Sequence, residues 1–548
     1  MAWQFYLRFA LNTSKPQVKH ASNIRPSVNS SPRVNGQFLD RQTASLVALH
    51  GAKTPGGQAG CKLTGRGRHG TAAPASLMGL RGVSTASRSP GHGSASAASP
   101  APKLETEAGD GDQRKLDFAC HSTFRDKTVW ELLRGLLVLK LSSHQTFVDN
   151  SLKIMNVSRR LLGQRLFGVA ARCTFYGHFI AGDSEAEARR LVKRLEQMGV
   201  ATILAVTAEE DVGENKGRYD ETRYDLNARD YMECMDLSLE LSSSKYRPVS
   251  QLKVTSFAKA DVLARITELL SEKGLSYEND SALSAGNLAQ GLDGQMAPIS
   301  ELNDEENDHL KLVLQRLDQI SQRAVKNNAR LLVDAERINI NPGITLLSLA
   351  LMSKFNKDEP VIWNTYQCYF KKKIDELQKD LRWSEKRGIC FGVKIVRGAY
   401  MDSEREYAER HQLQDPIHPS YEATSDAYNN VVSFMLTHIR RIPGRCGMIV
   451  ASHNEESVLK AVAKMEELGL SPSSGDVIFG QTLGIADRIT VALGQAGYLI
   501  YKSAPYGPIN DVLPYLVRRA QENNSVLQNL NSERTLMYKE FKTRIGLR

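Results

Sequence analysis

The chain has 548 residues, of which 41% are hydrophobic and 24% are charged, and its formal net charge is +10. The first hundred residues hold twelve Lys and Arg against one acidic residue, Asp40, whereas the remainder holds 59 Lys and Arg against 60 Asp and Glu. The body of the chain is therefore nearly neutral, which argues against a nucleic-acid-binding protein. Its seven cysteines are scattered without a CxxC or Cys/His cluster, so neither a disulfide framework nor a zinc or other metal site is expected.

Residues 1–100 are basic, poor in acidic residues and rich in Ser, Gly, Ala and Pro, as in GSASAASPAP near their end. This composition is typical of a mitochondrial transit peptide followed by a disordered linker, and the run from Arg81 to Ser84 offers a cleavage site. The competing interpretation is a disordered tail that binds nucleic acid. No stretch reaches eighteen uncharged apolar residues, so membrane contact is expected to be peripheral.

Residues 101–195 are predicted to form an N-terminal helical region. The most apolar segment of the chain, Leu132 to Leu141, lies in this region and is interrupted by Arg134 and Lys140. Such a pattern indicates an amphipathic or packing helix and not a membrane span.

From residue 196 to 548, short apolar or β-branched runs alternate with charged stretches of helical periodicity. This alternation predicts a distorted (β/α)8 TIM-like barrel with the helical region packed outside it. A doubly wound open sheet is the alternative, but the chain contains neither G-x-G-x-x-G nor a P-loop motif. The polar segment 276–300 is expected to be a surface insertion. Strands are expected at 201–207, 251–257, 330–336, 361–367, 390–398, 447–454, 476–482 and 497–505.

Polar residues gather where these strands end, which is where a barrel of this kind carries its chemistry. Seven of the eight strands behave alike, which is hard to explain by hydrogen bonding at a barrel rim alone. Arg397, directly before Gly398 and Ala399, suits the backbone approach of a pyrophosphate. The other candidates at strand ends are Lys253, Asp334, Asn364, Lys394, Ser452, His453, Asn454, Gln481, Thr482, Lys502 and Ser503.

Near the end of the chain, the segment YLVRRAQEN places Tyr515, Arg518, Arg519 and Glu522 on one side of a helix or its shoulder. Two adjacent guanidinium groups can hold a carboxylate through paired hydrogen bonds, which lysine cannot do. The alternative is a solvated helix face with an Arg–Glu pair.

Five motifs in this order resemble the proline dehydrogenases, flavoenzymes with a distorted (β/α)8 barrel: VKIVRGAYMDSE, VASHNEES, FGQTLGIAD, APYGP and YLVRRAQEN. The resemblance extends from about Leu161 to the C-terminus. Within the family the chain is most similar to the hydroxyproline dehydrogenase branch, as the segments RRLLG, LVDAE, MLTH and RRAQENNSVLQ indicate.

The resemblance implies a role for each candidate. Arg518 and Arg519, with Lys253, would clamp the carboxylate of the amino acid, Tyr400 and Tyr515 would wall its ring, and Asp334 would lie near its polar edge. Lys394 would lie near the flavin N5, where bacterial members often have arginine. FAD would be held by Arg397, Gly398, Ala399, Ser452, His453 and Asn454, with Lys394, Arg519, Asn364 and Glu522 in support.

Ser503 stands where members that prefer proline have tyrosine. Serine frees volume and offers a hydrogen-bonding group for the hydroxyl of 4-hydroxyproline, although a simple packing change would explain it as well. The resemblance thus implies oxidation of trans-4-hydroxy-L-proline to 1-pyrroline-3-hydroxy-5-carboxylate, with hydride transfer to FAD and electrons passed to ubiquinone at the mitochondrial inner membrane, on its matrix side. An L-proline dehydrogenase is the alternative.

Two further classes remain open. A Schiff-base aldolase would use a strand-borne lysine, Lys253 or Lys394, and would need no FAD. A non-catalytic basic binding protein would depend on residues 1–100 alone.

Overall fold

The computed structural model describes residues 121–208, 219–272, 282–522 and 531–547, together with Leu116 and Phe118. The transit-peptide prediction for residues 1–100 therefore lies outside the described residues. Within them the chain forms eight strands, and each lies within or beside a segment expected to be a strand. These are β1 (Val200–Ala205), β2 (Val249–Leu252), β3 (Arg330–Val333), β4 (Ile362–Gln367), β5 (Phe391–Val396), β6 (Cys446–Ala451), β7 (Val477–Thr482) and β8 (Ile500–Pro505).

The strands form one parallel sheet in the order β1-β8-β7-β6-β5-β4-β3-β2. The two edge strands, β1 and β2, also lie in contact, so the sheet is a nearly closed barrel. The predicted (β/α)8 TIM-like barrel is thereby confirmed, and the open doubly wound alternative is wrong.

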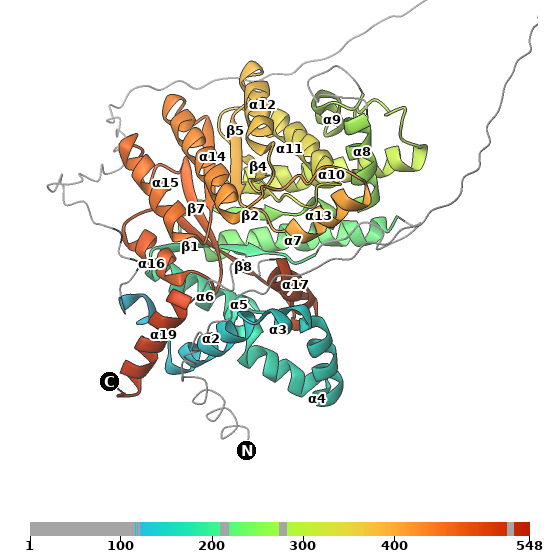
Figure 1. Ribbon diagram of the computed structural model, residues 1–548. Coiled ribbons are helices and arrows are strands. Elements are labelled where there is room, and N and C mark those ends of the chain that lie inside the picture. Colours follow the sequence, from blue (N-terminus) through green and yellow to red (C-terminus); the bar gives the residue numbers. More distant parts are fainter. Residues whose placement is uncertain are drawn as a thin grey trace, which may run out of the picture. The chain divides into compact units, whose positions relative to one another are not determined.

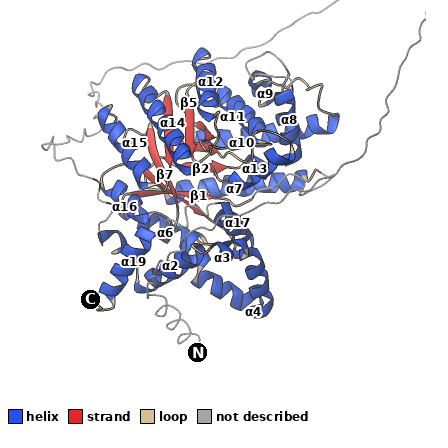
Figure 2. Ribbon diagram, in the orientation of Figure 1, coloured by secondary structure: helices blue, strands red, loops and turns tan. Residues whose placement is uncertain are grey.

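Helices cover the outer face of the barrel (Figures 1 and 2). They follow the strands in the alternation that the charge and apolar periodicity predicted. In chain order they are α7 (Glu221–Leu241), the short η2 (Val254–Ser256), α8 (Ala260–Glu272), α9 (Ala285–Gly291), α10 (Asp304–Lys326), α11 (Asn341–Phe355), α12 (Lys373–Lys386), α13 (Met401–Arg410), α14 (Tyr421–Arg441), α15 (Glu455–Glu467), α16 (Asp487–Gln495) and α17 (Ile509–Glu522).

Before the barrel, the chain forms η1 (His121–Phe124), α2 (Val129–Ser142), α3 (Gln145–Asp149), α4 (Ser151–Cys173), α5 (Phe175–Phe179) and α6 (Glu185–Gln197). The C-terminal α19 (Asn531–Arg544) packs against α2, so the two ends of the described chain meet beside the barrel (Figure 1). The last barrel helix, α17, contacts α3 and α4.

Large side chains fill the amino-terminal half of the barrel interior. Trp363 of β4 is fully buried there with Tyr501 of β8, and a Cβ on Gly392 of β5 would come within 2.3 Å of the Trp363 ring. The interior residue that follows Trp363 on the same strand is the polar Thr365, and the interior residue that follows Tyr501 is Ser503. The barrel is thus plugged at one end and hollow and polar at the other.

The second strand differs from the sequence-based expectation. β2 covers Val249–Leu252 instead of 251–257, and a short 3-10 helix, η2, takes the chain away from the sheet directly after Lys253. Pairing with β3, from Val249 opposite Arg330 to Leu252 opposite Val333, ends at the same point.

The segment 276–300 also differs from expectation over its described part, from residue 282 onward. Ser284 caps α9 by accepting a hydrogen bond from the Asn287 N–H, and α9 packs against α11. Leu283, Leu288 and Ile299 are buried in the main core. This part of the segment is therefore packed into the fold and is not a surface insertion. None of the helices in the described residues is long and apolar enough to cross a membrane.

Candidate active site

A cavity of about 550 Å³ opens at the carboxyl ends of the strands. Every strand contributes a lining residue, either from its last positions or from the residues directly after it, and α17 adds Tyr515, Leu516 and Arg519. Its volume lies within the ordinary range for sites that bind a cofactor or a small substrate.

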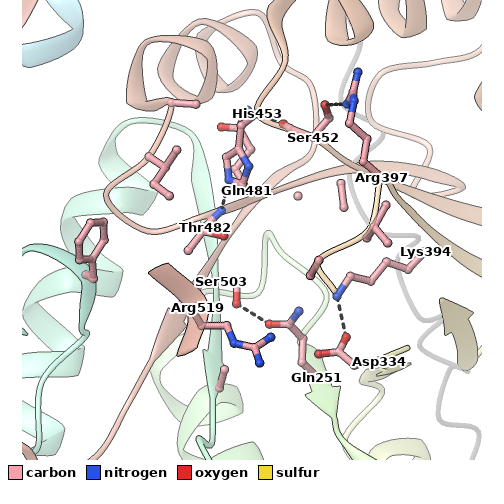
Figure 3. Close-up of a pocket in the computed structure, with 18 of the residues that line it drawn as sticks. Gln251, Asp334, Lys394, Arg397, Ser452, His453, Gln481, Thr482, Ser503 and Arg519 are labelled. Carbon is pink, nitrogen blue, oxygen red and sulfur yellow. Dashed lines mark hydrogen bonds and ion pairs between the residues drawn. The ribbon is translucent and has the colours of Figure 1, made fainter. Parts of the chain in front are cut away.

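Most candidates from the sequence meet in this cavity. The structure brings together Lys253, Asp334, Lys394, Arg397, Gly398, Ala399, Tyr400, Ser452, His453, Asn454, Ser503, Tyr515 and Arg519. Figure 3 draws Arg519, Ser503 and Gln251 at one end of the pocket and His453, Ser452 and Arg397 at the other. The cavity therefore has two distinct polar ends.

Lys394 and Asp334 form an ion pair inside the cavity. Lys394 points inward from β5 and Asp334 follows β3 directly, and Lys394 Nζ lies 2.6 Å from Asp334 Oδ1 (Figure 3). Both side chains are largely buried, with 11% and 19% of their surfaces exposed. Each partner offsets the cost of burying the other charge, and removal of one would leave the other uncompensated.

At one end of the cavity, Arg397 is fixed by hydroxyl groups. Its guanidinium donates to Ser452 Oγ at 2.9 Å and to Ser457 Oγ at 2.7 Å, and it lies 4.5 Å from the centre of the Tyr428 ring. Among the described residues its buried Nε has no hydrogen-bond partner. A cation held by neutral hydroxyl groups keeps its charge available for an anion.

The backbone beside Arg397 requires glycine. Gly398 has a φ of +136°, and a Cβ at this position would lie 1.5 Å from the Tyr369 ring. Any other residue would need both a strained backbone and a displaced aromatic ring. Glycine is therefore required here by the close packing of the main chain against Tyr369, and residues 397–399 line the cavity.

His453 is held as a neutral ring. The Thr482 N–H donates to His453 Nε2 at 2.9 Å, so Nε2 carries no proton and the Nδ1–H remains as the donor (Figure 3). Burial, reinforced by the charges of Lys502 and Arg397, lowers the pKa of His453 to about 3. The ring therefore serves as a fixed hydrogen-bonding group, and it is not an acid or base at neutral pH.

Beside His453, Asn454 caps α15 by accepting from the Ser457 N–H at 2.8 Å. The amino terminus of this helix therefore faces the same end of the cavity as Arg397.

Arg519 lies between two tyrosines on the α17 side of the cavity. Its guanidinium carbon lies 5.2 Å from the centre of the Tyr515 ring and 5.8 Å from that of Tyr400. Lys253 Nζ lies 6.0 Å from the Tyr515 ring on the barrel side. Two cations and two aromatic faces thus surround one small space, which suits an anionic head on an apolar ring.

Ser503 is not a lone hydroxyl. Its Oγ donates a hydrogen bond to Oε1 of Gln251, which points inward from β2 across the barrel (Figure 3). Because the serine proton is used in this bond, Ser503 offers the cavity an acceptor, and the Gln251 Nε2 group offers donors.

Three candidates do not reach the cavity or cannot be placed in it. Asn364 faces the outside of the barrel, where its Nδ2 donates to Thr345 Oγ1 of α11 at 3.5 Å; its neighbour Thr365 faces the cavity instead. Asn364 therefore does not lie where it could support FAD in this cavity, contrary to the expectation from the sequence. Arg518 lies on α17 but does not line the cavity, and the side chain of Glu522 lies outside the described residues.

Sequence reasoning missed several residues that line the cavity. Gln251 was assigned only as the first residue of a strand, and Tyr421 and Arg488 lie on helices away from the strand ends. Arg488 pairs with Glu455 at 2.6 Å. Lys502 was noted as a strand-end residue, but it points outward into a buried ion pair with Asp487 at 3.1 Å. Only the alternation of inward and outward residues along β8 could have revealed this.

A parallel barrel with a polar, cation-lined cavity at the carboxyl ends of its strands defines a (β/α)8-barrel enzyme. The sequence profile of the family "Proline dehydrogenase" matches residues 188–532. The chain belongs to the proline dehydrogenase family.

Curated relatives agree with this assignment over almost their full lengths. A hydroxyproline dehydrogenase from Xenopus laevis is 43% identical over 433 residues, which cover 79% of this chain and 91% of that protein. A proline dehydrogenase 1, mitochondrial, from Homo sapiens is 30% identical over 567 residues, which cover 83% of this chain and 92% of that protein. The crystal structure of proline utilization A from Bdellovibrio bacteriovorus, inactivated by N-propargylglycine, has a TM-score of 0.55 and 17% identity. That comparison covers 78% of this chain and 44% of the other, and it shows the shared fold.

Proposed function

We propose that this protein oxidises trans-4-hydroxy-L-proline to 1-pyrroline-3-hydroxy-5-carboxylate with FAD as its cofactor. The observation that carries the proposal is the inward-facing Ser503–Gln251 pair in the same cavity as Arg519. The cavity therefore offers a partner for a ring hydroxyl and a partner for a carboxylate. The relatives named hydroxyproline dehydrogenase, at 43% identity against 30% for a proline dehydrogenase, support the same substrate.

The residues at the Arg397 end suit an anionic dinucleotide. The buried Nε of Arg397 lacks a partner among the described residues, residues 397–399 line the cavity, and His453 offers Nδ1–H. FAD presents a pyrophosphate and ring carbonyl groups that can use these donors. FAD bound here would supply the acceptor for the hydride that leaves the substrate ring carbon.

At the other end, Arg519 is proposed to bind the substrate carboxylate through two hydrogen bonds, with Lys253 adding positive charge. Tyr400 and Tyr515 would restrict the ring to one plane. Holding the substrate by its carboxylate and its ring faces fixes which carbon is presented for oxidation, and such positioning can supply a large part of the rate enhancement.

Lys394 and Asp334 are proposed to set the charge at the centre of the cavity. The ion pair places the Lys394 ammonium in a largely buried part of the cavity, where it would stabilise negative charge that develops nearby. Asp334 would at the same time attract the substrate amine. The amine must lose its proton before hydride transfer, and the neutral His453 takes no part in that loss.

The electron acceptor is proposed to be ubiquinone, and the location is proposed to be the matrix side of the mitochondrial inner membrane. The basic, acid-poor composition of residues 1–100 supports a mitochondrial address, and a human relative carries the word mitochondrial in its name.

The substrate assignment is tested by Ser503→Tyr, with FAD-loaded enzyme and a soluble dye as electron acceptor. The phenol ring would fill the space beside Gln251 and remove the acceptor that Ser503 Oγ provides there. We expect kcat/KM for hydroxyproline to fall roughly a hundredfold relative to that for proline. An unchanged ratio of the two constants would favour the alternative, an L-proline dehydrogenase in which Ser503 is only a packing residue. A protein that binds no FAD would contradict the whole proposal.

A further inference from the structure

Helix α4 exposes an unusual amount of apolar surface. Leu161, Leu166 and Val169 have 79%, 63% and 60% of their surfaces exposed, whereas only Phe167 and Ala171 of this helix are buried. The remaining large apolar residues exposed on α4 are Leu152, Ile154, Val157 and Leu162. An apolar cluster of this size needs an explanation beyond scattered surface residues.

The exposed apolar residues of α4 gather on one side of each half of the helix. Ile154, Val157 and Leu161 follow one another at intervals of three and four residues, so they lie on one side of the first half of α4. The helix bends at Gly163, whose φ is +69°, and Leu166 and Val169 then share a side of the second half. Figure 1 shows α4 at the edge of the described chain, beside α3 and α17.

The charge of α4 is of one sign. Residues 151–173 contain five basic residues and no Asp or Glu, and Lys153, Arg160 and Arg165 are exposed. A helix with exposed leucines, whose charged residues are all basic, is typical of elements that lie in the interface of an anionic lipid bilayer.

Charge also argues against the other possible occupants of this surface. Two copies of α4 facing each other across a two-fold axis would bring like charges together without an acidic partner. The first hundred residues of the chain, with twelve Lys and Arg and a single Asp, carry the same sign as α4. An anionic lipid surface has the complementary sign.

The position of α4 connects this surface to the cavity. Gln164, next to the bend, donates from Nε2 to Asn510 Oδ1 of α17 at 2.6 Å, and the Arg159 guanidinium lies 5.2 Å from the centre of the Phe167 ring. The bend of α4 is thus anchored to α17, the helix that carries Arg519.

We propose that the exposed apolar residues of α4 dock the enzyme on an anionic lipid bilayer, with the leucines in the acyl boundary and the basic side chains at the headgroups. This orientation would hold α17 next to the lipid, where a membrane-dissolved electron acceptor resides. The proposal rests on the proposed function only for the nature of that acceptor.

The test is co-sedimentation of the full-length, FAD-loaded protein with vesicles of phosphatidylcholine, alone or mixed with phosphatidylglycerol. We expect Leu161→Gln/Leu166→Gln to weaken binding to mixed vesicles roughly tenfold or more, because two leucines no longer enter the acyl boundary. Arg160→Gln/Arg165→Gln should weaken binding roughly tenfold on mixed vesicles only, and high salt should abolish this difference.

A matched control is Leu239→Gln/Leu459→Gln, which changes two exposed leucines on α7 and α15 and should leave vesicle binding unchanged. All variants keep the basic N-terminal segment, so its contribution to binding cancels in the comparison. Oxidation of hydroxyproline with a soluble dye should be the same in every variant; failure of that assay in the wild type would contradict the proposed function and leave the docking result intact.

Three results would overturn the docking proposal. The wild type would remain in the supernatant with both kinds of vesicle, or the leucine variant would sediment as the wild type does. Alternatively, the leucine variant would change the oligomeric state in the absence of lipid, which would assign the α4 face to a second copy of the chain.

Discussion

Gln251 provides a sharp prediction about substrate choice, because its side chain points into the cavity and is hydrogen-bonded to Ser503. Its Oε1 accepts the Ser503 hydroxyl proton, which leaves Ser503 Oγ as an acceptor and Gln251 Nε2 as a donor for a substrate hydroxyl. Gln251→Leu keeps a similar volume but removes both functions. The hydroxyl of bound hydroxyproline then loses the Gln251 Nε2 donor, and an apolar leucine side chain takes its place.

A buried hydroxyl left without a partner costs about 1–3 kcal/mol, so kcat/KM for hydroxyproline should fall roughly 5- to 150-fold. For proline, which has no hydroxyl to satisfy, we expect a change of less than about threefold. The assay is reduction of a soluble dye with each substrate in turn. Gln367→Leu is a matched control: Gln367 lines the same cavity but donates to the Glu336 carbonyl, so both substrates should be affected equally.

Because Gln251 and Ser503 act as one hydrogen-bonded unit, their losses should not add. The compared quantity is the ratio of kcat/KM for hydroxyproline to kcat/KM for proline. In the double variant Gln251→Leu/Ser503→Ala we expect this ratio to be no lower than in the single variant with the lower ratio. Equal decreases of kcat/KM for hydroxyproline and for proline in Gln251→Leu would contradict a role of Gln251 in binding the substrate hydroxyl. They would show that Gln251 stabilises the barrel in general.

The remaining predictions concern three other residues. Arg519→Met should lower kcat/KM for either substrate roughly a hundredfold or more through loss of the carboxylate partner, whereas Arg518→Met, outside the cavity, should change it little. Arg397→Gln should weaken FAD binding roughly tenfold or more, measured as flavin released on dilution. Burial, helped by the charge of Lys127, lowers the pKa of His178 to about 3, and the unfolded chain binds that proton near pH 6.5. Because the unfolded chain binds this proton and the folded chain does not, the free energy of unfolding is highest above about pH 6.5. It falls by on the order of a few kcal/mol as the pH is lowered toward 3. His178→Gln should show a smaller loss of urea stability between pH 7 and 5 than the wild type.

Each of these predictions has a contradicting outcome. Similar decreases of kcat/KM in Arg518→Met and Arg519→Met would mean that both substitutions disturb helix α17. They would not then identify Arg519 as the partner of the substrate carboxylate. Unchanged flavin retention in Arg397→Gln would remove Arg397 from the cofactor site. Parallel acid-induced losses in the wild type and His178→Gln would assign the pH dependence to other groups.

The order and type of elements could be predicted because the strands are short apolar runs between amphipathic helices. Whether an individual strand residue points into the barrel or away from it could not be predicted. In a parallel barrel, both faces of a strand are buried, so the usual alternation of apolar and polar residues is absent. Asn364 and Thr365 illustrate this: either could have faced the cavity, and only the register of β4 places Thr365 inside. The same ambiguity explains why Lys502 was misplaced.

The adjacent arginines of α17 posed a similar problem, because neighbouring helical residues point about 100° apart and the sequence does not show which one faces inward. The described part of segment 276–300, from residue 282 onward, differs from the surface insertion that its polar composition predicts, because Leu283 and Leu288 are buried. Gln251 was missed because a single amide near the start of a strand has no local signature.

Oxidation of hydroxyproline by bound FAD is tested by an anaerobic titration of the purified, FAD-loaded enzyme, with the flavin absorbance as the readout. Trans-4-hydroxy-L-proline and L-proline are added separately. We expect rapid bleaching of the flavin by hydroxyproline and slow bleaching by proline, and a smaller difference between the two rates in Gln251→Leu. Faster bleaching by proline would contradict the substrate assignment, and a protein that cannot be loaded with FAD would contradict the proposed chemistry itself.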